Sequence, residues 1–170
     1  MVPVSTAARH ASLNGGRAPE LDTLLALGDA PESETIRQAL APQLSSWSQN
    51  PRKATVVLSG LARLRLPVVA AQLLDVMQAG RVEVNVFHYN AAVNACEKAG
   101  DWQLAIALLE KMPQMSVTPD SISFNSAMSA CEKGQQWQLA VSLLASMDGM
   151  RVRRDTISFN SAISACEKGG

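Results

Sequence analysis

A stretch of fourteen residues occurs twice in this chain, as SISFNSAMSACEKG at 121–134 and as TISFNSAISACEKG at 156–169. The copies differ only at their first and eighth positions, and they start 35 residues apart. Three parts of the pattern keep this interval further upstream. An aromatic residue stands at Tyr89, Phe124 and Phe159, and an Asn follows it at Asn90, Asn125 and Asn160. A Cys-Glu-Lys triplet begins at Cys96, Cys131 and Cys166. A fixed period of this length indicates a repeat architecture, in which each repeat is one supersecondary unit.

The period divides most of the chain into units. A Leu-Leu-x-x-Met run begins at Leu73, Leu108 and Leu143, so a diverged unit precedes the two clear ones. We predict repeats at 51–85, 86–120 and 121–155, followed by the first helix of a truncated repeat at 156–170. Because this last helix has no second helix after it, we expect the chain to be a fragment of a longer array.

Residues upstream of the array carry a weaker pattern. Ile36, Leu40, Leu44 and Trp47 share one helical face across Pro42, a residue that kinks or ends helices. We therefore predict that residues 20–50 form a degenerate or capping helical unit.

The first residues of the chain have a different composition. Residues 1–19 contain Arg9, His10 and Arg17 together with several hydroxyl residues, but no acidic residue. This bias is typical of an organelle transit peptide. A disordered tail is the alternative, and the sequence alone does not separate the two.

Within each unit the apolar spacing predicts two helices. Tyr89, Ala92, Val93 and Cys96 follow the i, i+3, i+4, i+7 spacing of one helical face. Gly100 and Asp101 have the residue types that end one helix and cap the next, and the second helix carries its apolar face at Leu104, Ala105, Leu108, Leu109 and Met112. Such a short pair cannot bury its apolar faces alone, so the pairs must stack. The predicted fold is all-α, a right-handed superhelical α-solenoid of stacked helix-turn-helix repeats.

Composition and charge restrict the function. The formal net charge is zero, so no strong overall field attracts nucleic acid or acidic lipid, and no apolar run is long enough to cross a bilayer. The cysteines lie too far apart for a metal knuckle and the chain has only two histidines, His10 and His88. We expect no metal, no cofactor and no membrane partner. We expect no enzyme either, because no nucleophile set, paired carboxylates or phosphate loop is present.

The repeat motifs point to one family. Tyr/Phe-Asn at the start of the first helix, Leu-Leu-x-x-Met in the second and an Asp after a short loop, at a 35-residue period, resemble the pentatricopeptide repeat. The SACEKG and WQLA motifs resemble the variant common in dinoflagellate algae. The resemblance covers 51–170 and is most specific over 86–170. It implies sequence-specific binding of single-stranded RNA, one base per repeat, in processing, stability or editing of plastid or mitochondrial transcripts.

The resemblance also implies which residues contact RNA. In the family, the residue after Tyr/Phe and the last residue of the unit read one base together, and the pairs here are Thr55 with Asn85, Asn90 with Asp120, and Asn125 with Asp155. Asn160 is a first member without a second. Similar pairs favour adenine for Thr/Asn and uracil for Asn/Asp. The residues implied to flank the bases are Phe87, Ile122 and Ile157, with Arg52 at this place in the first unit. Those implied to meet phosphate are Arg63, Lys98, Lys133 and Lys168.

Each of these residues also has a purely structural interpretation. Asn90 and its equivalents are of a type that satisfies backbone amides at helix starts, and Asp120 and Asp155 of a type that favours the positive end of the next helix. The lysines sit beside Glu97, Glu132 and Glu167, which offset their charge. We expect the cysteines to be small buried side chains, and Trp102 and Trp137 to be packing residues. The alternative function is a helical scaffold for protein–protein interaction with no RNA role.

Overall fold

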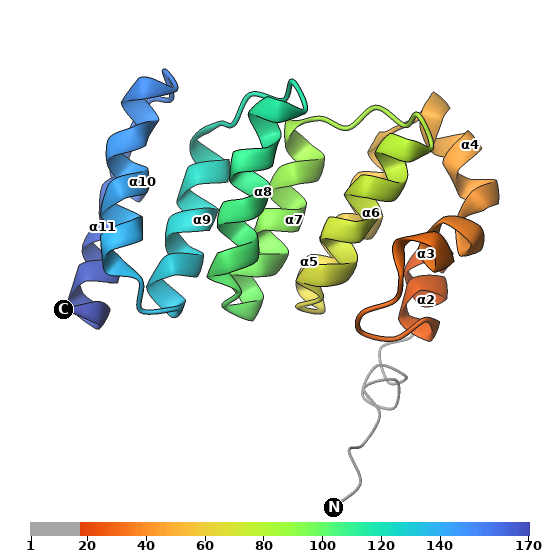
Figure 1. Ribbon diagram of the computed structural model, residues 1–170, viewed down its shortest axis with the longest axis horizontal. Coiled ribbons are helices and arrows are strands. Elements are labelled where there is room, and N and C mark those ends of the chain that lie inside the picture. Colours follow the sequence, from red (N-terminus) through yellow and green to blue (C-terminus); the bar gives the residue numbers. More distant parts are fainter. Residues whose placement is uncertain (1–17) are drawn as a thin grey trace, which may run out of the picture.

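The computed structural model describes residues 18–170, and within them it contains helices and no strand (Figure 1). This confirms the predicted all-α solenoid of helical hairpins. The helices are α2 (Pro19–Ala26), α3 (Ser33–Ala39), α4 (Ala41–Gln49), α5 (Arg52–Arg63), α6 (Pro67–Ala79), α7 (Val86–Ala99), α8 (Trp102–Gln114), α9 (Ser121–Lys133), α10 (Trp137–Gly149) and α11 (Thr156–Gly169). No helix within 18–170 is long and apolar enough to span a membrane.

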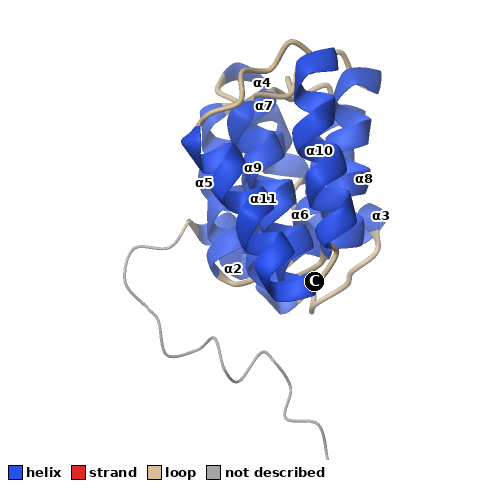
Figure 2. Ribbon diagram, turned by 90° about the vertical axis from the view of Figure 1, so that its left-hand side faces the viewer, coloured by secondary structure: helices blue, strands red, loops and turns tan. Residues whose placement is uncertain are grey.

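The hairpins stack in two layers. The first helices of the units, α5, α7, α9 and α11, pack side by side along the whole array, while the second helices α6 and α8 barely touch. In the end-on view of Figure 2, α5, α9 and α11 lie on one side of the molecule and α8 and α10 on the other. Closer packing in one layer bends a stack toward that layer. The first helices therefore form the inner face of the array, where repeat proteins present their binding surfaces.

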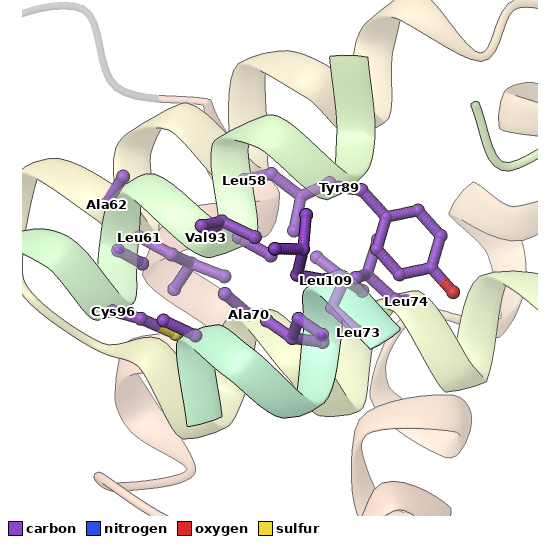
Figure 3. Packing of buried hydrophobic residues seen from close by; sticks show 14 of the residues in the cluster. Leu58, Leu61, Ala62, Ala70, Leu73, Leu74, Tyr89, Val93, Cys96 and Leu109 are labelled. Atoms are coloured by element: carbon purple, nitrogen blue, oxygen red, sulfur yellow. The ribbon is translucent and has the colours of Figure 1, made fainter. Parts of the chain in front are cut away.

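One continuous apolar core runs between the layers. Figure 3 shows the part where α5, α6, α7 and α8 meet, with Leu61, Leu73, Val93 and Cys96 packed against one another. Tyr89 is fully buried, and its hydroxyl accepts a hydrogen bond from the Gln78 amide at 3.3 Å. Because each helix contributes apolar residues to the contact with the next unit, the core has no break between repeats.

The turns repeat as regularly as the helices. Residues with positive φ recur at the 35-residue period at both turns of each unit, namely Arg65, Gly100 and Gln135 after the first helix and Arg81, Ser116 and Arg151 after the second. The residue that follows each of them donates its backbone N–H to a carbonyl five residues earlier, as Asp101 does to Cys96 and Val117 to Met112. This is the Schellman geometry, in which a left-handed residue ends a helix.

The recurring glycine before Trp-Gln-Leu-Ala has a packing reason. Gly134 has negative φ, so its backbone does not require glycine. A Cβ at Gly134 would lie 2.1 Å from Cδ1 of Trp102, and one at Gly169 would lie 2.9 Å from Cδ1 of Trp137. Each indole therefore packs on the glycine of the following unit. Gly100 follows a unit with Pro67 at the Trp position, and there the left-handed backbone is what favours glycine.

The N-terminal part differs in detail from the sequence prediction. The single face expected across Pro42 is divided between two helices, because α3 ends at Ala39 and α4 restarts with Pro42 in its first turn. The predicted tail or transit peptide, 1–19, lies outside the described residues except at its end, where Pro19 already starts α2. Residues 19–49 thus form three short helices, and their apolar side chains cover one end of the core.

The last helix exposes the face that its predecessors bury. Phe124, Met128 and Cys131 of α9 are buried in the structure. At the equivalent positions of α11, Phe159 is 47% exposed and Ile163 is 56% exposed. Their exposure follows because no helix packs against this face of α11 within residues 18–170.

Gly134→Ala should destabilise the protein by about 1–3 kcal/mol, because the added methyl group overpacks against the Trp102 indole. Gly149→Ala is the matched control: a Cβ there meets nothing within 4 Å, so stability should stay unchanged or rise slightly. Urea unfolding followed by circular dichroism measures both. Equal stability of the two variants would show that the Trp102 contact is not what requires glycine.

Candidate nucleic-acid interface

Two of the three predicted base-reading pairs are in direct contact on the inner layer. Nδ2 of Asn90, on α7, donates to Oδ1 and Oδ2 of Asp120 at 3.1 and 3.3 Å. Nδ2 of Asn125, on α9, donates to Oδ1 of Asp155 at 3.4 Å. The stacking of the units therefore brings residues 30 positions apart into one polar site, and it repeats that site one unit along.

The third pair is near but not bonded. Thr55 and Asn85 both line an open pocket of about 590 Å³ between α5 and the start of α7, together with Arg52, Val56 and Phe87. The Asn85 side chain accepts from the Phe87 backbone N–H at 3.1 Å and so caps α7. The predicted adenine site thus has the space for a base and polar groups at its wall.

Each second member of a pair is also a helix N-cap. Oδ1 of Asp120 accepts the Ser123 backbone N–H at 2.9 Å, and Oδ1 of Asp155 accepts that of Ser158 at 2.8 Å. The structural interpretation of these aspartates is thus correct, and it does not exclude the functional one. A carboxylate has about four acceptor positions. In Asp120 the cap occupies one position on Oδ1, and the Asn90 amide contacts both oxygens, which leaves a position on Oδ2. Acceptor capacity remains for a ligand.

The structural interpretation of Asn90 and Asn125, that they satisfy backbone amides at helix starts, is wrong. Asn90 and Asn125 lie inside their helices, and their amides donate across to the next unit instead of to backbone groups at their own helix start. Oδ1 of Asn90 also accepts a hydrogen bond from the Ser123 hydroxyl at 2.5 Å. Oδ1 of Asn125 is buried and has no hydrogen-bond partner among residues 18–170.

Apolar side chains stand exposed beside these sites. Phe87, Ile122 and Ile157, the predicted base-flanking residues, are between 58% and 68% exposed. Each lies in the first turn of its helix, two residues after the capping residue. Because they recur at the 35-residue period, they form a row of exposed apolar side chains at the starts of α7, α9 and α11. Arg52, at the same position of α5, is exposed as well.

The predicted phosphate-contacting residues divide into two groups. Nζ of Lys133 bonds Oε1 of Glu97 at 2.8 Å, and Lys168 bonds Glu132 in the same way one unit later. Each lysine is thus paired with the glutamate of the preceding unit. Lys98 has no such partner because Ala62 stands at the corresponding position, and neither Lys98 nor Arg63 has an ion pair within 18–170.

Hydrogen bonding keeps the acidic groups ionised. The backbone N–H and hydroxyl of Ser158 hold the pKa of Asp155 below its usual value. Burial raises the pKa of Glu132, but hydrogen bonds from Lys168 and Ser164 outweigh it and lower the pKa overall. Asp155 therefore acts only as an acceptor at neutral pH.

His88 was not predicted as a site residue, but its ring links the two segments that form the Thr55–Asn85 site. It is fully buried at the position that Ser123 and Ser158 occupy in the later units. Nδ1 accepts from the Asn85 backbone N–H at 3.1 Å, and Nε2 donates to the Pro51 carbonyl at 2.9 Å. When the repeats are aligned, His88 falls at the same position as the two serines, and this alignment is the signal by which the sequence could have identified it.

Cys96 and Cys131 are buried and the tryptophans are packing residues, as expected, whereas Cys166 was also predicted to be buried and is only half-buried on α11. Burial raises the pKa of Cys96 to about 12 and that of Cys131 to about 11, so neither is a thiolate at neutral pH. Within residues 18–170 no group of three or more metal-ligating side chains gathers. Trp102 and Trp137 pack partly buried against the core.

The last predicted reader lies apart from a complete site. Asn160 is exposed on α11. Phe159, the residue before Asn160, lines an open pocket of about 600 Å³ together with Ser121, Arg153, Asp155 and others. The Arg154 guanidinium lies 5.9 Å from the centre of the Phe159 ring.

Two family models match the chain. One, described as PPR repeat family, covers residues 84–133, and another, described as PPR repeat, covers residues 122–152. The first match includes both Asn90 and Asp120, and the two matches overlap along α9. No curated protein matches the chain.

The buried His88 should make stability depend on pH. Burial is the largest influence on its pKa and lowers it, so the unfolded chain binds more protons than the folded one below about pH 6.5. The free energy of unfolding should therefore fall as the pH drops from 7 to 5. His88→Ser, which copies the residue of the later units, should lose this component. Urea titrations at stepped pH compare the two, and equal pH slopes would contradict the assignment.

Proposed function

Because this chain belongs to the pentatricopeptide repeat family, whose repeats generally bind RNA, we propose that its inner layer binds single-stranded RNA with one base at each inter-repeat site. The observation that carries the proposal is the Asn90–Asp120 contact beside exposed Phe87 and Ile122. The pair offers hydrogen-bonding groups held in place, and the exposed apolar side chains beside it could stack against a flat base.

The chemistry of the pair favours uracil. The Asn90 amide has a second N–H besides the one that it gives to Asp120, and the carboxylate keeps acceptor positions free. A donor next to an acceptor matches the carbonyl and the N3–H on the Watson–Crick edge of uracil. Cytosine has an unprotonated N3, which a carboxylate repels. Asn125 with Asp155 offers the same groups to a second uracil, and Thr55 with Asn85 receives adenine.

The flanking residues supply affinity that does not depend on sequence. Stacking of a base on an aromatic side chain contributes roughly 1–3 kcal/mol, and Phe87 offers such a surface. Ile122 and Ile157 offer smaller apolar surfaces at the next two units. The strand lies with its 5′ end toward α5, so its core reads AUU.

Phosphate attraction is concentrated at the N-terminal end of the array. Arg63 and Lys98 carry charges with no ion-pair partner within 18–170, whereas Lys133 and Lys168 are neutralised by glutamates. Backbone contacts generate the salt-sensitive part of RNA affinity. We expect this part to be weak here, so that base contacts account for more of the binding.

The same neutralisation favours the second candidate function, a protein-binding scaffold. An inner face with paired charges and exposed Phe87, Ile122 and Ile157 also suits an extended peptide. Changes to Asn90 or Asp120 would then leave RNA affinity unchanged, because no base would meet them.

We further propose that the protein acts in a plastid or mitochondrion, on the processing, stability or editing of transcripts. The support is the family resemblance and the acid-free composition of residues 1–19. Fusion of residues 1–50 to a fluorescent protein tests this localisation, and a diffuse cytosolic signal would contradict it.

Asp120→Asn should change base preference without removing the helix cap, because Asn caps helices as well as Asp. The added N–H can donate to N3 of cytosine, so binding of AUU-core RNA should weaken by about fivefold or more relative to ACU-core RNA. Fluorescence anisotropy with short labelled RNAs measures the ratio. Asp101→Asn is the control, since Asp101 caps α8 in the same way outside the site. Equal ratios in both variants would sink the base-reading assignment.

Glu97→Gln should release Lys133 for phosphate. RNA affinity should rise at low salt, and the slope of log affinity against log salt should steepen by about 0.7, the value for one additional contact to a single strand. Glu110→Gln, on the exposed side of α8, removes the same charge elsewhere and should leave the slope unchanged. An unaltered slope in Glu97→Gln would show that Lys133 does not reach the RNA backbone.

A further inference from the structure

The Ser123 side chain joins the two members of the base-reading pair in front of it. It is fully buried at the start of α9. Its hydroxyl donates to Oδ1 of Asn90, at 2.5 Å, and lies 3.0 Å from Oδ1 of Asp120. It also accepts the Asp120 backbone N–H at 3.1 Å. One small side chain thus contacts both readers although it belongs to the following unit.

We propose that Ser123 is a positioning residue of the Asn90–Asp120 site: its hydroxyl fixes the orientation of the Asn90 amide and thereby sets the preference of this site for uracil. The inference rests on the proposed function, because it concerns how sharply the site tells bases apart. Ser123 itself does not touch the base.

The physical reason lies in the shape of an amide. The oxygen and nitrogen ends of an Asn side chain are nearly equal in size, and a half-turn exchanges a donor for an acceptor. Asp120 attracts the nitrogen end, and the Ser123 hydroxyl holds the oxygen end. With both ends held, the remaining N–H of Asn90 is fixed in one direction. A base that needs a donor there meets a group already oriented.

The other two sites in the chain lack this contact. Ser158 makes the same capping bonds to Asp155, but it has no hydrogen bond to Asn125, whose Oδ1 is buried without a partner within 18–170. The Asn125 donor distance is also longer, 3.4 Å against 3.1 Å. Two identical Asn–Asp pairs therefore differ in how firmly the amide is held.

At the first site the equivalent residue has no hydroxyl at all. Both ring nitrogens of His88 are occupied, one by the Asn85 N–H and the other by the Pro51 carbonyl. Thr55 has no amide to orient, so the site does not need a positioning donor. The three sites thus form a series, and the strongest discrimination should occur at Asn90–Asp120.

The experiment compares three variants of the full chain by RNA anisotropy and thermal unfolding. Ser123→Ala should reduce the preference for AUU-core over ACU-core RNA by about threefold to tenfold, as expected for one lost hydrogen bond. Ser123→Thr keeps the hydroxyl and should restore the preference. Ser158→Ala removes the same kind of cap without an amide contact, and it should lower the melting temperature while leaving discrimination at the middle base unchanged.

The outcomes separate the possibilities. If Ser123→Ala and Ser158→Ala lose similar stability and Ser123→Ala keeps its base preference, Ser123 is only a cap and the inference is wrong. If the unchanged protein binds both RNAs equally, the proposed function fails, and the inference with it. Should Ser123→Ala not fold, Ser123→Cys keeps the size with a much weaker donor, and it should show the same loss of preference. Retained preference in Ser123→Cys would equally overturn the inference.

Discussion

Each first helix of the array is buried by the first helix that follows it, and this contact sets the geometry of everything else. Because α5, α7, α9 and α11 pack in line, residues with a 35-residue spacing lie in rows on one face. The second helices brace this layer from behind and touch each other little. A different contact, with the second helices, covers the face that lies between the layers: Phe159 and Ile163 of α11 are exposed, while the same positions on α9 are buried.

The polar row that caps the helices is also the proposed recognition site. Asp120 caps α9, accepts from Asn90 and keeps acceptor positions free, while Ser123 completes the cap and holds the amide. The proposed base reading would therefore use groups that the backbone already requires for capping. A capping residue cannot move away from its helix start, so its carboxylate is held in place at little additional cost in entropy.

The sequence predicted the helical hairpins well, because the apolar spacing and the repeated motifs both follow the local geometry of a helix. Contacts between units were harder. The glycine of SACEKG packs under the Trp of the unit before it, and Lys133 pairs with Glu97, but the linear pattern places those residues far apart. The roles of His88 and Ser123 were missed for the same reason. Their bonds run to Pro51 and Asn90, in neighbouring units that only stacking brings close. Positive φ at Arg81 and Ser116 escaped prediction because neither residue type signals it.

The contacts of Ser123 also decide where one repeat can be cut from another. In the proposed recognition site, the contacts that begin at Asn90 end at Ser123, so the transferable unit would be longer than the sequence period and would overlap its neighbour at the start of α9. A designer who exchanges residues 86–120 alone would carry over the pair and leave its orienting hydroxyl to chance. Exchange of 86–123 would move the complete proposed recognition element. Because residues 121–123 also belong to the next unit, two adjacent elements would need the same residues at these positions.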